Sequence, residues 1–319
     1  MPPSNAVLAV LNFFEKFEQR NLKYIGLTYA FLNACTFTLG SLIIKLLTQY
    51  SPSEIALYRG IVGSVFSYFV LRGTGGTIVI QGAKNNFYTI VFRSGILIIL
   101  TLAQYYSTKA LPLGEAKVLS SVEPVISGIT AAFLLNEKYD FSQFAAFVLS
   151  FFGILLIIKP HFLFPDWVAQ GNKYTDPENR TLGQILVLVM VFMSVALRIA
   201  TRKHLSKLNS MVVAFYSLFV QCFIMPLFII FSGREMVSFT VRPDLLICFG
   251  ISALVTQALG VRALKFETVG RCTLMGHAGI VMSYLLDIFV LGIDIDAYSF
   301  GGALLIIVSV FLMVLWKSK

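Results

Sequence analysis

The sequence predicts an all-α, polytopic membrane protein of ten transmembrane helices in two inverted five-helix repeats. Three observations support this fold class. Of the 319 residues, 57% are hydrophobic and only 13% are charged, whereas about a quarter of the residues of an ordinary soluble domain are charged. Apolar stretches of about 20 residues, the length that crosses a bilayer, recur along nearly the whole chain. Landmark residues of the first half also recur in the second half at nearly constant offsets, which is typical of an internal repeat.

The first repeat is predicted over residues 22–160, after a cytoplasmic N-terminal segment at 1–21. Its first span is uncharged between Lys23 and Lys45, and its second follows the turn-forming Ser51-Pro52-Ser53. A glycine-rich loop then precedes the third span. The five spans are expected at about 24–44, 54–71, 87–108, 113–135 and 141–158.

An outer connection is predicted over residues 161–180, where prolines and polar residues interrupt the apolar pattern. The second repeat follows over 181–319. Its spans are expected at about 182–201, 210–231, 245–264, 267–291 and 297–316.

The two repeats share spaced landmarks. Gly26 and Lys45 flank the first span with the same spacing with which Gly183 and Arg202 flank the sixth. Farther on, residues 104–111 (QYYSTKAL) match residues 257–264 (QALGVRAL). Because each unit holds an odd number of spans, the second unit is expected to be inverted in the membrane.

The distribution of basic residues predicts the orientation. The net charge is +9, but the lysines and arginines sit mostly in short connections, which argues against nucleic acid as a partner. With the N-terminus inside, the inner connections hold most of these residues, so both termini are expected to be cytoplasmic. The choice between plasma membrane and endomembrane stays open. The four cysteines fall in apolar segments and indicate neither a disulfide framework nor a metal site.

Several motifs resemble those of the drug/metabolite transporter superfamily, with two EamA-type units. They are SPSEIALYRG at 51–60, KALPLGE at 109–115, SVEP at 121–124, LNEK at 135–138 and GILLIIKP at 153–160. Within that superfamily the chain is most similar to solute carrier family 35 subfamily G, through IKPHFLF at 158–164 and RALKFETVG at 262–270. The resemblance covers residues 22–317. It implies ten helices, secondary transport of small, often anionic metabolites, and a central cavity shared by the two units.

Charged residues inside the predicted spans are the main functional candidates, because charges at membrane depth usually face a cavity and pair. The bases outnumber the acids, and this excess suits a carboxylate or phosphate, which arginine binds in bidentate fashion. We therefore expect an anionic organic solute. Arg198 and Lys117 lie near span ends and are also explained by snorkelling to the headgroups. The charged residues are Arg59, Arg93, Lys117, Arg198 and Arg271, with Glu123 and Asp287 as the acids.

Two polar stretches within apolar spans are expected to face a midplane cavity: KVLSSVEPVISG at 117–128 and RCTLMGHAG at 271–279. In the first, Ser120 and Ser121 share a helical face with Pro124, which is expected to act as a hinge. Glu123 either pairs with an arginine or takes up a proton. In the second, His277 lies on one stripe with Asp287, as a proton or substrate contact or as a hydrogen-bonded packing histidine.

The remaining predicted substrate-binding residues are uncharged. Gln104 and Gln257 repeat across the two units and are expected to line the same cavity. Tyr58 and Tyr105 are further candidates. Together with Arg59, Arg93, Arg271, Ser120 and Ser121 they complete the predicted substrate-binding set.

The sequence favours no enzyme, cofactor or metal. An intramembrane aspartyl protease needs two opposed aspartates, and only Asp287 lies well inside a span; no glycine-rich nucleotide loop or metal-ligand cluster appears. The favoured function is secondary transport by alternating access, with exchange and proton coupling both open. The expected partners are a small solute and the lipid bilayer, and a homodimer stays open. The alternative is a non-transporting membrane protein that acts as partner or regulator of another membrane protein.

Overall fold

The computed structural model describes residues 24–47, 49–73, 86–110, 119–138, 140–158, 177–206, 208–232, 238–291 and 297–316. Some side chains within these ranges are also left undescribed. Over the described ranges the chain is helical, with turns and short irregular connections and no strand. The predicted N-terminal segment at 1–21 and most of the predicted outer connection lie outside the described residues.

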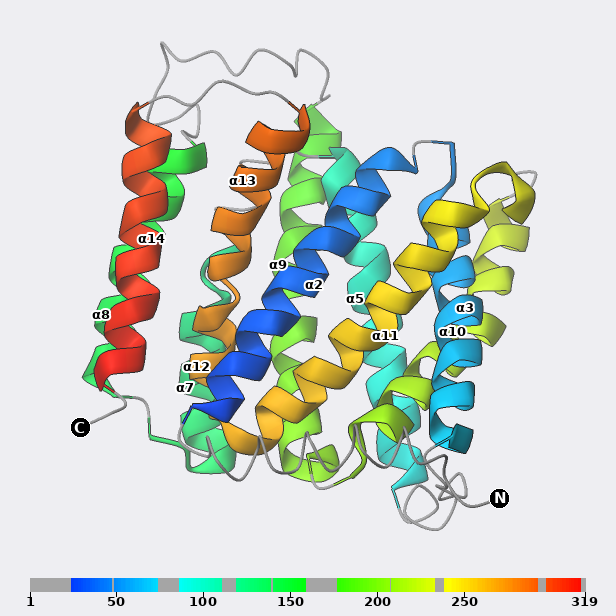
Figure 1. The fold of residues 1–319 in the computed structure, drawn as a ribbon, viewed down its shortest axis with the longest axis horizontal. Helices are drawn as coiled ribbons and strands as arrows, with labels where there is room; N and C mark the ends of the chain where they lie inside the picture. The colour runs from blue at the N-terminus through cyan, green and yellow to red at the C-terminus, as the bar shows by residue number, and fades with distance from the viewer. Residues whose placement is uncertain are drawn as a thin grey trace. The chain divides into compact units, whose positions relative to one another are not determined.

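A helix lies at each of the ten predicted spans, as Figure 1 shows. The helices of the first repeat are α2 (Ile25–Leu46), α3 (Pro52–Gly73), α5 (Phe87–Ala110), α7 (Glu123–Leu135) and α8 (Phe141–Ile158). Those of the second are α9 (Pro177–Ala200), α10 (Ser210–Ser232), α11 (Pro243–Phe266), α12 (Val269–Met275), α13 (Ala278–Leu291) and α14 (Ala297–Trp316). A π-helical turn η1 (Thr201–Leu205) continues α9, and a 3₁₀ turn η2 (Phe239–Val241) precedes α11.

The lengths and compositions of these helices suit a bilayer. Within the described residues, 6 helices are long and apolar enough to cross a membrane. Shorter apolar helices cover Glu123–Leu135, Phe141–Ile157 and Phe300–Leu315. The prediction of an all-α, multi-pass membrane protein is therefore confirmed.

The compact units of the structure do not coincide with the sequence repeats. Unit 1 comprises Met1–Gly95 and Ala200–Glu267, and unit 2 comprises Ile96–Ile199 and Thr268–Lys319. Each unit therefore takes helices from both repeats, and the boundary between the units divides α5. The packing of helix faces determines which helices are neighbours in space. These neighbours do not follow the order of the repeats along the chain.

Helix α3 begins with a capping box that explains part of the SPSE motif. The backbone N–H of Ser51 donates to Glu54 Oε2 at 2.6 Å, and the N–H of Glu54 is 3.4 Å from Ser51 Oγ. These two bonds satisfy N–H groups that the first turn leaves without an intrahelical acceptor. Pro52 lies in that turn, where the missing N–H of proline costs nothing. The motif thus has a local structural cause.

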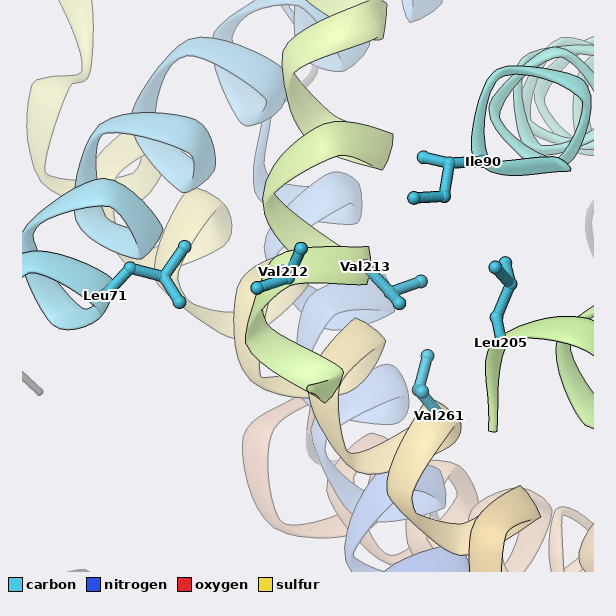
Figure 2. Close-up of a cluster of buried hydrophobic side chains, with 6 residues drawn as sticks. All are labelled: Leu71, Ile90, Leu205, Val212, Val213 and Val261. Carbon is cyan, nitrogen blue, oxygen red and sulfur yellow. The ribbon is translucent and has the colours of Figure 1, made fainter. Parts of the chain in front are cut away.

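In unit 1, α3 packs against α10, and α11 packs against both α2 and α3. Helices α3 and α11 approach closely at Gly250, where an added Cβ would lie 2.4 Å from the Cβ of Val62. A hydrophobic cluster fills the space beside these helices (Figure 2). It joins α3, α5, η1, α10 and α11 through Leu71, Ile90, Leu205, Val212, Val213 and Val261.

In unit 2, α8 packs against α14 and α7 packs against α12. Figure 1 shows α8 and α14 side by side. Their backbones approach at two glycines: a Cβ on Gly302 would lie 2.5 Å from the carbonyl oxygen of Gly153. Small residues allow such approach between membrane helices, where dispersion contacts replace the hydrophobic effect as the source of association. Ile154, Val281 and Ile306 pack together beside this contact.

Replacing Gly302 with valine is expected to destabilise the protein by about 1–3 kcal/mol or more, because the side chain would overlap the backbone of α8. The measurement is the melting temperature of the purified protein in detergent. Gly301→Val is the matched control, since no heavy atom lies within 4 Å of a Cβ at Gly301. Equal melting temperatures for the two variants would contradict the close α8–α14 contact.

Candidate functional site

Both polar stretches singled out in the sequence contain a helix break. Residues 119 and 120 are helical, Ser121 and Val122 form a turn, and α7 begins at Glu123. Gly276 and His277 form the corresponding turn between α12 and α13. Figure 1 shows α12 and α13 as successive short helices. The broken segments bring polar side chains and altered backbone into otherwise apolar spans.

The break in the first stretch lies just before the predicted hinge. Pro124 falls in the first turn of α7, where proline is tolerated because no intrahelical acceptor awaits its N–H. At the break a backbone hydrogen bond spans three residues instead of the four of an α-helix: the N–H of Val125 donates to the carbonyl of Val122 at 3.1 Å. In the second stretch, the N–H groups of Gly276 and His277 donate at 3.0 Å to carbonyls three residues earlier.

A buried hydroxyl pair joins the two stretches within unit 2. Ser127 Oγ of α7 donates to Thr273 Oγ1 of α12 over 3.1 Å. Both side chains are buried. The sequence placed both residues near the expected cavity but offered no sign that they bond to each other.

Glu123 is ion-paired with Arg198, which lies on α9. Arg198 Nε donates to Glu123 Oε1 at 2.9 Å, and the hydroxyl of Ser194 donates to the same oxygen. Ser194 and Arg198 are four residues apart and therefore share a helical face. Of the two roles that the sequence left open for Glu123, pairing is the one this geometry displays. Arg198, which the sequence also explained by snorkelling, is engaged by this carboxylate in the structure.

Arg271 also makes an ion pair within unit 2. Its Nη2 lies 2.8 Å from Oδ2 of Asp140, the residue before α8. The Arg271 side chain is 16% exposed and that of Asp140 is 46% exposed. Arg271, a predicted substrate contact, is thus engaged by the carboxylate of Asp140, which was not among the predicted site residues.

His277, in the second break, is buried and contacts α8. Its Nδ1 lies 2.8 Å from Ser150 Oγ, and Ser150 also donates to the carbonyl of Phe147 in its own helix. A histidine whose ring nitrogen has a hydroxyl partner is stabilised in place. This geometry matches the packing role that the sequence left open for it.

Arg93 is the hub of a buried polar network in unit 1. Its side chain lies on α5 and is almost fully buried. Its Nε donates to Thr201 Oγ1 at 2.9 Å, its Nη2 donates to Gln257 Oε1 at 2.9 Å, and its Nη1 donates to Ser217 Oγ. All three nitrogens of the guanidinium are therefore engaged by neutral groups on η1, α10 and α11. Two predicted site residues, Arg93 and Gln257, bond directly to each other.

Arg59 lies on α3 and makes a second polar contact within unit 1. Its Nη2 donates to Gln221 Oε1 on α10 at 3.2 Å. The neighbouring Tyr58 is buried and packs its ring edge-to-face against Tyr50 and Phe239. Gln221, Thr201 and Ser217 were missed in the sequence, because nothing in an isolated apolar span shows which hydroxyl or amide will meet an arginine.

The remaining predicted site residues differ in how deeply they are buried. Gln104 and Ser120 are half-buried, and Ser121 is buried. Lys117 lies outside the described residues, and so do the side chains of Tyr105 and Asp287. Among the described residues, no group of histidine, cysteine and acidic side chains is arranged to hold a metal ion.

Comparison with known proteins identifies the family. The model of the EamA-like transporter family matches residues 24–159 and again residues 181–315. This chain belongs to the EamA-like transporter family. The two matches fall on the two halves in which the sequence landmarks recur, and the predicted resemblance is confirmed.

Named relatives include transporters from bacteria. Human "Solute carrier family 35 member G1" is 25% identical over 292 residues, which cover 89% of this chain and 77% of that protein. "Pseudopaline exporter CntI" from Pseudomonas aeruginosa is 22% identical over 287 residues, covering 89% and 94%. The "S-adenosylmethionine uptake transporter" from Rickettsia prowazekii is 26% identical over 202 residues, covering 61% and 60%.

A solved crystal structure shares the fold, with a TM-score of 0.74 at 16% identity, covering 94% of this chain and 98% of that chain. Family membership and the apolar helices make this EamA-like protein a multi-pass integral membrane transporter. It is not an enzyme, since the family and its named relatives are transporters.

Replacing Ser217 with alanine is expected to cost about 1–3 kcal/mol of stability, because it leaves a buried N–H of Arg93 without its acceptor. Ser309→Ala is the matched control: both serines are buried and both donate to a carbonyl of their own helix. The melting temperature in detergent should fall clearly more for Ser217→Ala. A larger fall for Ser309→Ala would contradict the hub role of Arg93.

Proposed function

We propose that this protein is a secondary transporter that moves a small anionic organic metabolite by alternating access. In this proposal the two repeats are inverted relative to each other and rock about a site near the bilayer midplane. The named relatives support a small organic molecule as the solute, since pseudopaline and S-adenosylmethionine are the cargoes in two of their names.

The observation that carries the anionic preference is the environment of Arg93. Among the described residues, its hydrogen-bond partners are a threonine, a serine and a glutamine, and no carboxylate pairs with it. A buried cation with neutral partners keeps its full charge, and in a medium of low dielectric that charge acts over a longer range than in water. An anion is attracted by such a charge, and a cation is repelled.

The other arginines differ from Arg93 in the charge of their partners. Arg198 and Arg271 are each offset by a carboxylate, Glu123 and Asp140. Arg59 is half-buried and donates to an amide oxygen. A guanidinium group binds a carboxylate or phosphate through charge-assisted hydrogen bonds. We assign Arg59 as the direct contact of unit 1 and Arg93 as its buried electrostatic support.

Reconstituted in liposomes, the protein is expected to take up succinate or glycerol 3-phosphate in preference to the neutral diamide of succinate. The measurement is uptake of radiolabelled solute, with S-adenosylmethionine included as a cationic comparison. Trapped unlabelled anion will stimulate uptake by an exchanger, whereas an inward proton gradient will stimulate a proton-coupled carrier. Uptake of only neutral or cationic solutes would overturn the anionic preference, and silence across the panel would favour a regulatory partner role.

Replacing Arg59 with alanine is expected to reduce anion uptake to background while the protein still elutes as a single folded species. The physical reason is the loss of the charged contact to the solute. Arg72→Ala on the same helix is the control, because Arg72 is exposed at the end of α3 and donates to the hydroxyl of Tyr68. Wild-type uptake by the Arg59 variant would sink its assignment.

We also propose that both termini face the cytoplasm, because the basic residues concentrate in the inner connections under that topology. In intact cells, a Ser318→Cys variant should resist a membrane-impermeant maleimide and react only after permeabilisation. The unsubstituted protein measures the background from the native cysteines. Equal labelling in intact and permeabilised cells would show the opposite orientation.

A further inference from the structure

Arg198 is held by one nitrogen of its guanidinium. Its Nε donates to Glu123 Oε1 at 2.9 Å, which is the bond that links α9 to the start of α7. Within the described ranges, neither Nη1 nor Nη2 of Arg198 has a hydrogen-bond partner. The edge formed by these two nitrogens presents parallel N–H groups, the geometry that binds a carboxylate or phosphate in bidentate fashion.

The exposure of Arg198 distinguishes it from Arg93. The Arg198 side chain is 29% exposed, whereas Arg93 is 3% exposed and has all three nitrogens engaged. The Arg198 side chain is therefore partly open, whereas the nitrogens of Arg93 are enclosed by protein groups. Both arginines lie in apolar stretches of the sequence. In the folded structure they differ in side-chain exposure and in the number of guanidinium nitrogens that are hydrogen-bonded.

Glu123 and Ser194 position this guanidinium. Ser194 donates to the same Oε1 that accepts from Arg198, so the carboxylate is itself fixed by α9. A fixed Nε prevents the long side chain from snorkelling to the headgroups and keeps the free edge in one direction. Helix α9 ends two residues after Arg198 and continues as the π-helical turn η1 from Thr201, a local irregularity that is frequent at functional sites.

We propose that Arg198 binds the anionic group of the solute through Nη1 and Nη2, with Glu123 as its positioning residue; this inference rests on the proposed function. The bound anion and the Glu123 carboxylate then lie on the same guanidinium and repel each other. Replacing the Glu123 carboxylate with an uncharged amide removes that repulsion and keeps an oxygen that accepts from Nε.

The charges around Glu123 support this assignment. On α12, which packs against α7, the charged side chain is Arg271, and it is paired with Asp140. Helix α9 carries Arg198 near its C-terminal end and Glu178 and Arg180 at its N-terminal end. Cys272 on α12 is the other titratable group, and α8 carries none. Glu123 is thus the carboxylate whose charge competes most directly with an anion on Arg198.

The first test compares Arg198→Lys with Arg202→Lys in liposomes, using whichever of succinate or glycerol 3-phosphate the wild type takes up. Lysine keeps the charge but lacks the planar fork, so the half-saturation concentration should rise by about tenfold, the loss expected for one charge-assisted hydrogen bond. Arg202, four residues on, donates to the carbonyl of Lys265, and its lysine variant should stay within about twofold by the same scale. Equal values for wild type and Arg198→Lys would overturn the proposal.

The second test uses variants that remove charge. Glu123→Gln should bind the anion more tightly than the wild type, because the carboxylate that repels the bound anion is gone. The double variant Glu123→Gln/Arg198→Gln leaves no unpaired buried charge and is expected to fold, as judged by its melting temperature. It should lose anion binding relative to Glu123→Gln alone, and retained binding would overturn the role of Arg198. If the wild type binds neither anion, the proposed function fails, and this outcome is distinct from a failure confined to the variants.

Discussion

A charged side chain at membrane depth must find its partners inside the protein, because lipid offers neither counter-charge nor hydrogen bonds. In unit 1 this constraint gathers a threonine, a serine and a glutamine around Arg93, and so ties α5 to η1, α10 and α11. In unit 2 it joins α7 to α9 through Glu123 and Arg198, and α12 to the start of α8 through Arg271. The polar residues thereby specify which apolar helices become neighbours.

Close helix packing and local helix breaks have different roles within the units. Close glycine contacts, such as Gly153 with Gly302, let backbones approach so that many dispersion contacts form. The breaks before Glu123 and at Gly276-His277 replace regular helical bonds with shorter-range ones. Irregular backbone at membrane depth is tolerated where it is buried in protein or lines a water-filled cavity. The broken segments are therefore where polar chemistry can be placed without loss of the surrounding fold.

Much of the architecture could be predicted from the amino-acid sequence alone. Hydrophobic length located the ten spans, and constant offsets such as that between Gly26 and Gly183 located the repeats. The stretches around Glu123 and His277 were singled out because polar residues there are costly. The partners were not predictable: Thr201 and Ser217 are distant from Arg93 in sequence, and Asp140 was assigned to no site. The sequence also did not show that a helix break lies before Glu123, which places Pro124 in the first turn of α7.

By itself, the sequence determined the membrane class, the ten spans, the repeated landmarks and the family, because hydrophobicity and spacing are properties of the local chain. Only the tertiary structure decided that compact units mix helices from both repeats, and that Arg93 is enclosed while Arg198 keeps an open edge. Both outcomes depend on how each helix is rotated about its axis and on which neighbour it meets. Those quantities arise from packing between segments far apart in the chain, and no local pattern encodes them.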